Sequence, residues 1–221
     1  ILRAEIQHST RVGRLPDDVR EGGGFLHPEV AMDRLIFGAS EYAKDGLLPL
    51  TEWLGRSAWQ ARLTGIADDV IAHAPYRSAF GPIPSMSAEV NGEMLQVLTR
   101  LAFLTGEERY ARQALAIARF YFEEVLPKSN GLPPHLWDAA AGKPAADFFQ
   151  FADHGNEIAG GLSEFVLFLD RRGHPLREPM AENLSRLIHL LLDVGLNEDG
   201  VWIMKISCSG REVIDARHAH C

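Results

Sequence analysis

Two stretches, Ser87-Ala-Glu-Val-Asn-Gly-Glu93 and Asp153-His-Gly-Asn-Glu157, each lead into a long apolar run. The first run covers residues 94–104 and the second covers residues 158–169. Apolar residues recur in both at the spacing of an α-helix. Because both runs are apolar nearly all round, we expect two helices that are buried on most sides.

The same two stretches mark a repeat. Glu93 and Glu157 lie 64 positions apart, and so do Leu98 and Leu162. Each unit contains a helix, a tight turn, a second helix and a loop. The second helices are amphipathic, so we expect them to face solvent on one side. Alternating buried and half-exposed helices predict two concentric layers.

The rest of the chain continues this pattern. We predict helices over residues 32–45, 57–74, 88–104, 107–126, 154–171 and 176–195, a β-prone run over 201–206, and loops over 75–86 and 128–152. Gly46 is expected to stop the first helix. Residues 1–31 are polar and glycine-rich, so we expect an irregular segment ahead of a helical domain over 32–207 and a C-terminal segment over 208–221.

The predicted fold class is all-α, with repeated antiparallel hairpins and short β segments in the loops. This pattern resembles the α/α toroids, or six-hairpin barrels, of many glycoside hydrolases and polysaccharide lyases. The resemblance covers residues 32–207, and Ser87–Glu93, Asp153–Glu157 and, more weakly, Asp45-Gly-Leu-Leu-Pro-Leu50 carry it. The chain has room for about three hairpins, so we expect an incomplete or truncated toroid.

The composition is that of a globular protein. The 221 residues are 46% hydrophobic and 24% charged, which allows a large core without disulfides. With 22 basic and 30 acidic side chains the net charge is −8, and the basic residues form no run. Neither nucleic acid nor a membrane is therefore expected as a partner. No signal peptide or transmembrane segment is expected, and compartment and oligomeric state are left open.

Glu93 and Glu157 are the leading catalytic candidates. In the toroid enzymes that the chain resembles, the site lies where the inner helices begin. Cleavage of a glycosidic bond by hydrolysis uses two carboxyl groups roughly 5–10 Å apart, and neighbouring packed helices lie about 8–10 Å apart. Glu89, one turn before Glu93, and Asn91 are predicted to bind substrate. The structural alternative is that these acids only favour the positive ends of the helix dipoles.

Asp153, His154 and Asn156 surround the start of the other buried helix. Asp153 is predicted either as a further catalytic carboxylate or as an N-cap. His154 can act as a base or, like Asn156, contact the carboxylate of a uronic acid. The alternative for His154 is a hydrogen bond to a loop.

The loop over residues 128–152 is rich in aromatic side chains. Trp137 and the cluster Phe148-Phe149-Gln150-Phe151 are expected either to stack on sugar rings or to anchor the loop in the core. His135 and Asp138 flank Trp137 and are predicted as polar contacts to the substrate.

Metals and cofactors are not expected. Cys208, His218, His220 and Cys221 do not have the spacing of a zinc site, and two histidines two positions apart do not share a helix face. The sequence contains neither a glycine-rich phosphate loop nor a G-x-S-x-G elbow.

The chain is therefore expected to be a carbohydrate-active protein that cleaves glycosidic bonds of a poly- or oligosaccharide, by hydrolysis or β-elimination. One alternative is a non-catalytic helical repeat scaffold that binds a protein partner, although the long loop over 128–152 argues against uniform repeats. An isoprenoid-type toroid enzyme shares the fold class, but the sequence lacks an Asp-rich metal motif.

Overall fold

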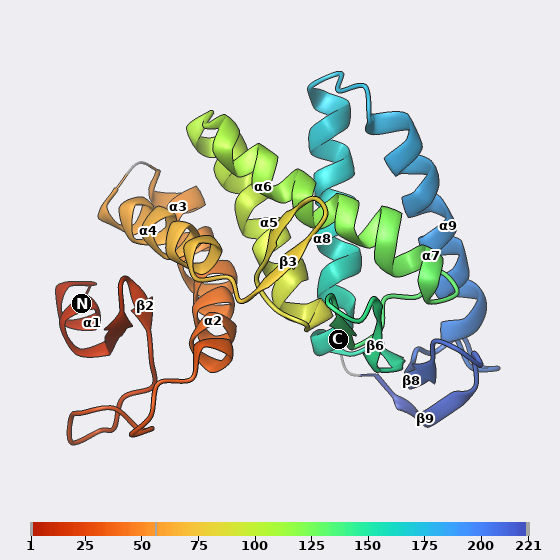
Figure 1. Ribbon diagram of the computed structural model, residues 1–221, viewed down its shortest axis with the longest axis horizontal. Helices are drawn as coiled ribbons and strands as arrows, with labels where there is room; N and C mark the ends of the chain where they lie inside the picture. Colours follow the sequence, from red (N-terminus) through yellow and green to blue (C-terminus); the bar gives the residue numbers. More distant parts are fainter. Residues whose placement is uncertain (1, 56, 220–221) are drawn as a thin grey trace. The chain divides into compact units, whose positions relative to one another are not determined.

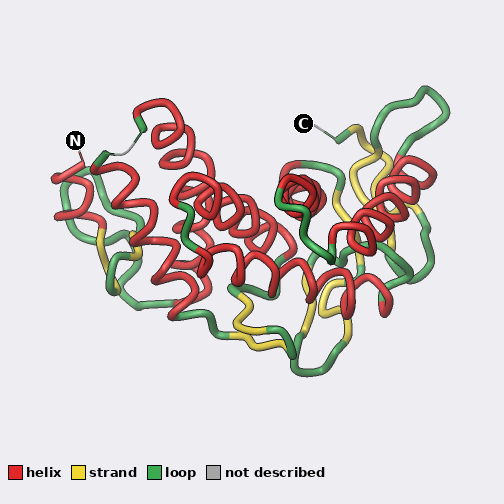
Figure 2. Tube along the Cα trace, turned by 90° about the horizontal axis from the view of Figure 1, so that it is seen from above, coloured by secondary structure: helices red, strands yellow, loops and turns green. Residues whose placement is uncertain are grey.

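The computed structural model describes residues 2–55 and 57–219, and the chain divides into two compact units, residues 1–75 and 76–221 (Figure 1). Helices dominate both units, and short strands pair within each unit (Figure 2). The predicted helical fold is confirmed. Among the described residues, every helix is too short or too polar to cross a membrane.

In the first unit, α1 (Leu2–Ser9) leads into a hairpin of β1 (Thr10–Val12) and β2 (Leu15–Pro16). A continuous helical stretch follows, made of α2 (Met32–Glu41), the π-helix η1 (Tyr42–Leu47) and α3 (Leu48–Leu54). The last helix, α4 (Ala58–Ala72), packs against all three. The core between them consists of aliphatic side chains, among them Leu35, Ile36, Leu47, Leu63, Ile66 and Val70.

The prediction that residues 1–31 are irregular is wrong at the start of the segment, where α1, β1 and β2 form. Glu5 of α1 is paired with Arg62 of α4, with Oε1 2.6 Å from Nη2. The hydroxyl of Ser9 also donates to the Glu5 carboxylate. Because the partner of Glu5 lies 57 positions away, no local pattern in the sequence reveals this helix.

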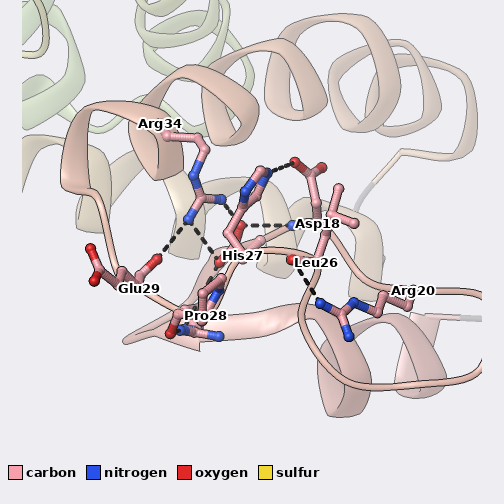
Figure 3. Close-up of polar contacts among 9 residues, drawn as sticks. Asp18, Arg20, Leu26, His27, Pro28, Glu29 and Arg34 are labelled. Atoms are coloured by element: carbon pink, nitrogen blue, oxygen red, sulfur yellow. Dashed lines mark hydrogen bonds and ion pairs between the residues drawn. The ribbon is translucent and has the colours of Figure 1, made fainter.

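Arginine side chains hold the segment between β2 and α2 (Figure 3). Arg20 donates to the carbonyl of Leu26 at 3.2 Å, and Arg34 donates to the carbonyl of Glu29 at 3.1 Å. These bonds add to backbone bonds within the same segment, such as that from the Leu26 N–H to the carbonyl of Asp18 at 2.8 Å.

The predicted helix stop at Gly46 is also wrong. Gly46 lies within η1, where an added Cβ would meet the ring of Tyr42 at 3.0 Å. The wider π turn carries the chain past this glycine without ending the helix. Pro49 then falls in the first turn of α3, where a missing N–H leaves no bond unmade.

The second unit opens with a hairpin of β3 (Tyr76–Ser78) and β4 (Gly81–Ile83). Two helix pairs follow: α5 (Ala88–Thr105) with α6 (Glu108–Arg119), and α8 (Asp153–Arg171) with α9 (Arg177–Gly195). The π-helix η2 (Phe120–Val125) and the short α7 (Leu126–Lys128) extend α6. Gly106, with φ of 73°, ends α5 in the left-handed conformation that favours glycine.

The loop over 128–152 contains three strands. In it, β5 (Leu136–Asp138) pairs with β6 (Lys143–Ala146). The third strand, β7 (Phe148–Gln150), forms an antiparallel sheet with β8 (Ile203–Ser207) and β9 (Val213–His218), in the order β7-β8-β9. The strand β8 overlaps the predicted β-prone run. The strand β9 belongs to the C-terminal segment and pairs with β8.

Helix α5 lies between α6 and α8 and packs against both (Figure 1). From Ala88 to Ala102 all its residues except Arg100 are buried, which confirms the expected burial. The buried residues include five polar ones, namely Glu89, Asn91, Glu93, Gln96 and Thr99. Buried polar groups require partners, and the partners of these five residues define the candidate site.

Candidate active site

Asn91 holds the start of α5 in place. Its Nδ2 donates to the carbonyl of Ser85 at 2.8 Å and to the hydroxyl of Tyr121 at 3.1 Å, and its Oδ1 accepts from the Ser85 N–H at 3.2 Å. Burial raises the pKa of Tyr121, so its hydroxyl stays neutral. Asn91 is fully buried and its amide is occupied. These bonds give Asn91 a role in positioning α5, and its predicted contact with substrate stays a prediction.

Glu89 and Glu93 lie one turn apart on the same face of α5, as predicted. Their exposed fractions are 6% and 2%, and a carboxylate oxygen of each lies within 4.8 Å of one of the other. Paired carboxyl groups are the side chains that glycoside hydrolysis uses as acid and base. The pair therefore has the composition of an acid–base site.

A glycine crossing brings α8 against this part of α5. A Cβ on Gly92 would lie 2.3 Å from the carbonyl carbon of Glu157, and a Cβ on Gly161 would lie 2.7 Å from the carbonyl oxygen of Gly92. Glu157 thus contacts the residue that precedes Glu93. The two candidate acids lie on neighbouring helices in direct contact.

Gln96 and Arg100 extend the contact along both helices. The amide of Gln96 donates to Oε2 of Glu157 at 2.7 Å. One turn further, Arg100 forms a two-pronged ion pair with Glu164, at 2.9 and 2.6 Å. These contacts advance along α5 and α8 in the same order, so the two helices run parallel.

Gln96, Arg100 and Glu164 were not predicted as site residues. The interval of 64 positions in the sequence could have revealed one of these contacts, the ion pair of Arg100 with Glu164. Arg100 and Glu164 lie 64 positions apart, the same interval as Glu93 and Glu157. Because α5 and α8 run parallel, residues separated by this interval can face each other, as Arg100 and Glu164 do.

Asn156 and Glu157 face different sides of α8. Consecutive residues of an α-helix are turned by about 100°. Glu157 bonds to Gln96 of α5, whereas Asn156 lines a hollow of about 250 Å³ with Ala159 of α8 and Ile188 of α9. Phe149, Phe151 and Trp202 form the aromatic wall of this hollow. The structure therefore separates Asn156 from the carboxylates with which it was grouped.

The residues predicted around Trp137 serve mainly to hold the loop. Trp137 is 1% exposed, which favours the stated alternative that its ring anchors the loop in the core. Asp138 accepts from the N–H groups of Ala140 and Ala141, at 2.9 and 3.0 Å, in the turn that follows β5.

His135 connects this loop to the start of α5. Its ring stacks on Phe148, with centroids 4.8 Å apart, and its carbonyl accepts from the N–H of Ala88 at 3.1 Å. Phe149 and Phe151 are buried and contact each other edge to face. Of the two alternatives stated for the aromatic cluster, these contacts favour anchoring.

The backbones of Asp153 and His154 form the first turn of α8, but their side chains lie outside the described part of the structure. Their predicted catalytic roles therefore stay predictions.

Cys208 lies in the core beside β8. Burial and the nearby charge of Asp147 raise the pKa of its thiol to about 12, so the thiol stays protonated. A zinc ligand would have to be the thiolate. His220 and Cys221 lie outside the described residues altogether.

No protein-family profile matches the sequence, and no curated protein matches it. The fold is similar to that of an α-1,6-mannanase of Salegentibacter sp. HEL1_6, with a TM-score of 0.65 and 14% identity over 97% of this chain and 56% of that one. It is also similar to a cellobiose 2-epimerase of Bacillus thermoamylovorans B4167, with a TM-score of 0.63 and 8% identity over 80% of this chain and 50% of the epimerase.

A D-mannose isomerase gives a TM-score of 0.58 and 14% identity, over 96% of this chain and 58% of the isomerase. The chain thus spans about half the length of the proteins it matches. Identities this low relate the folds alone. The chain resembles the α/α toroid, glycosidase-like enzymes, and no single family among them is fixed.

Proposed function

We propose that this chain is part of an α/α toroid of repeated hairpins that cleaves glycosidic bonds in a poly- or oligosaccharide, with Glu93 and Glu157 as its acid–base pair. The observation that carries the proposal is the glycine crossing, which places Glu157 against the turn of α5 that bears Glu93. This reaction requires two carboxyl groups, and the adjoining helices α5 and α8 carry one candidate each.

The similar structures support a sugar as the substrate. The mannanase has been solved as inactive variants in complex with α-1,6-mannotriose and α-1,6-mannotetrose. The epimerase and the isomerase also act on sugars, as their names state. We extend this substrate class to the present chain by proposal.

Of the two possible chemistries, we favour hydrolysis. One carboxyl group would protonate the leaving oxygen, and the other would act as base or nucleophile. β-Elimination from a uronic acid requires a positive group to neutralise its carboxylate. Arg100 lies on the same side of the α5–α8 contact as Gln96, but it is already paired with Glu164.

Each remaining candidate has a place in the proposal. Gln96 would hold the Glu157 carboxylate in one orientation through its 2.7 Å bond. Glu89 would contact the substrate beside Glu93, and Asn156 would contact it from the other side of α8. Asp153 and His154 remain proposed catalytic groups at the start of α8.

A panel of oligosaccharides with analysis of the products tests the proposal. We expect new reducing ends without the ultraviolet absorbance of an unsaturated uronate. Glu157→Gln and Glu93→Gln should each lower the rate by about 10²–10⁴-fold, the usual contribution of a general acid or base. Glu164→Gln, seven residues along α8 from Glu157, is the matched control and should retain nearly full activity.

Two outcomes would contradict this proposal. The unsaturated product would identify a lyase, and full activity in both Glu→Gln variants would remove these residues from the reaction.

One observation favours the alternative of a protein-binding scaffold. Phe103 of α5 and Leu167 of α8, one repeat apart, are 67% and 63% exposed. That alternative would be supported if a partner protein co-purifies with the chain, if Phe103→Ser abolishes this binding, and if no glycan yields product.

A further inference from the structure

The first unit contains a pocket of about 360 Å³ that belongs to residues 1–75 alone. This volume falls within the range of small-molecule sites, roughly 300–1,000 Å³. Its wall includes Glu5, Asp18, Arg34, Phe37, Glu41 and Tyr42. Arg34, Phe37 and Glu41 follow one another at helical spacing, so α2 presents one continuous face to the pocket.

The polar side of the pocket is held rigidly. The side chain of Asp17 is fully buried and forms ion pairs with Arg34 and with Arg11. Burial by itself would raise the pKa of Asp17, but hydrogen bonds from Arg34 and the Asp18 N–H, with the charges of both arginines, lower it overall. Asp17 therefore stays ionised and fixes the guanidinium of Arg34 at the pocket wall.

Two further contacts limit movement of the wall. Figure 3 shows Arg34 reaching the backbone of Glu29 while His27 lies beside Asp18. On the other side, burial and the neighbouring Glu5 raise the pKa of Tyr42, so its phenol remains protonated. A wall with fixed charges and a neutral phenol is preorganised for a ligand, which reduces the entropy cost of binding.

The kinds of groups in the wall restrict the ligand. Carboxylates of Glu5, Asp18 and Glu41 accept hydrogen bonds, whereas the guanidinium of Arg34 donates them. A hydroxyl group can do both. Phe37 and Pro16 add apolar surface, which suits the C–H face of a sugar ring. The carboxylates outnumber the arginine in the wall, so an anionic ligand would be repelled.

We propose that this pocket binds a single neutral sugar ring. The inference goes beyond the bond cleavage proposed for Glu93 and Glu157, because those residues belong to residues 76–221. It also names a ligand class, since uncharged sugars are favoured over uronic acids.

Isothermal titration of the whole chain with D-mannose, D-glucose and D-glucuronate tests the charge preference. At least one neutral sugar should bind, and glucuronate should bind at least about tenfold more weakly than that sugar. Equal or tighter binding of glucuronate would overturn the inference. So would the failure of both neutral sugars to bind.

Two variants locate the binding. Phe37→Ala removes the apolar face, and Asp18→Asn removes a carboxylate from a side chain that is 66% exposed. Each should weaken neutral-sugar binding at least about fivefold. Asp33→Asn is the matched control, because Asp33 is an exposed residue of α2 outside the pocket wall. Unchanged binding in both pocket variants would place the site elsewhere and end the proposal.

The same samples separate this inference from the proposed function. Product release is measured in parallel with the glycan panel. If the unmodified chain releases product and neither pocket variant weakens sugar binding, only the pocket proposal is overturned. If both pocket variants weaken sugar binding and no glycan yields product, the pocket proposal is supported and only the proposed cleavage reaction is overturned.

Discussion

A Cβ atom on Gly92 would lie 2.3 Å from the carbonyl carbon of Glu157, so α5 and α8 touch backbone to backbone at this point. A separation that short is far inside van der Waals contact, and the obstructing atoms are backbone atoms that cannot rotate away. The contact between the two helices that carry the candidate acids depends on the absence of a side chain at Gly92.

Gly92→Ala should therefore destabilise the protein. Overpacking of this kind costs about 1–3 kcal/mol, more than the helix propensity that alanine adds, about 1 kcal/mol. Chemical denaturation measures the change in the free energy of unfolding. Gly160→Ala is the control, because the nearest atom to its added Cβ, Nε2 of Gln96, is 3.8 Å away. We expect Gly160→Ala to be neutral or stabilising, and equal losses in both variants would refute the crossing.

Asn91 and Tyr121 should be energetically coupled. Tyr121→Phe removes the hydroxyl that accepts from Asn91, and Asn91→Ala also removes the bonds to Ser85. A buried hydrogen bond contributes about 0.5–1.5 kcal/mol net. The double-mutant cycle should return a coupling energy of that size, measured by urea unfolding. Strictly additive losses would show that the bond contributes nothing.

Asp69 should make the stability of the protein depend on acid pH. A hydrogen bond from the Arg14 side chain lowers the pKa of Asp69; burial opposes this shift, and the Arg14 N–H and charge add to the lowering. The unfolded chain therefore binds the proton at higher pH than the folded chain, so the stabilisation holds above about pH 4–5 and is lost as the pH falls further. Asp69→Asn should cost about 1.5–3 kcal/mol at pH 7.

The difference between the original protein and Asp69→Asn should shrink toward pH 2–3, where Asp69 itself becomes protonated. Urea unfolding at a series of pH values measures this. Asp68→Asn, the adjacent change, is the control, since the pair with Arg14 is made by Asp69. A difference that stays constant down to about pH 2 would argue against the ion pair.

Cys208 should be unreactive in the folded protein. Its thiolate is the reactive form, and burial raises the thiol pKa to about 12. In a Cys221→Ser background, a thiol-specific chromogenic reagent at pH 8 should react slowly with the native protein and rapidly in guanidinium. Rates that match in the two conditions would show that Cys208 is accessible, contrary to its burial against β7 and β8.

The positions of the main helices could be predicted because their cause is local. Apolar periodicity over 88–104 and 154–171 gave bounds within one residue of α5 and α8. The repeat interval also identified Glu93 and Glu157 as corresponding residues. The predicted helix end at Gly46 was wrong because the chain continues there through the π-helix η1, which no spacing of residue types reveals.

Several candidate site residues could not be judged without the tertiary structure. Asn91 and Trp137 have the side chains of sugar-binding residues, but their neighbours in space bury them. Asn156 and Glu157 are adjacent in the sequence, but their side chains face different sides of α8 because consecutive residues of a helix are rotated about its axis. Gln96 was missed because its partner is 61 positions away.

The sequence by itself determined the main helices and the acidic residues at the starts of α5 and α8, since periodicity and capping act over a few residues. Only the tertiary structure decided that Gly92 and Gly161 let these helices touch, and which polar side chains have partners already. Burial and contact depend on chain segments tens of residues apart. For that reason the candidate acids could be named from the sequence, whereas the contact between their helices and the pocket beside α2 could not.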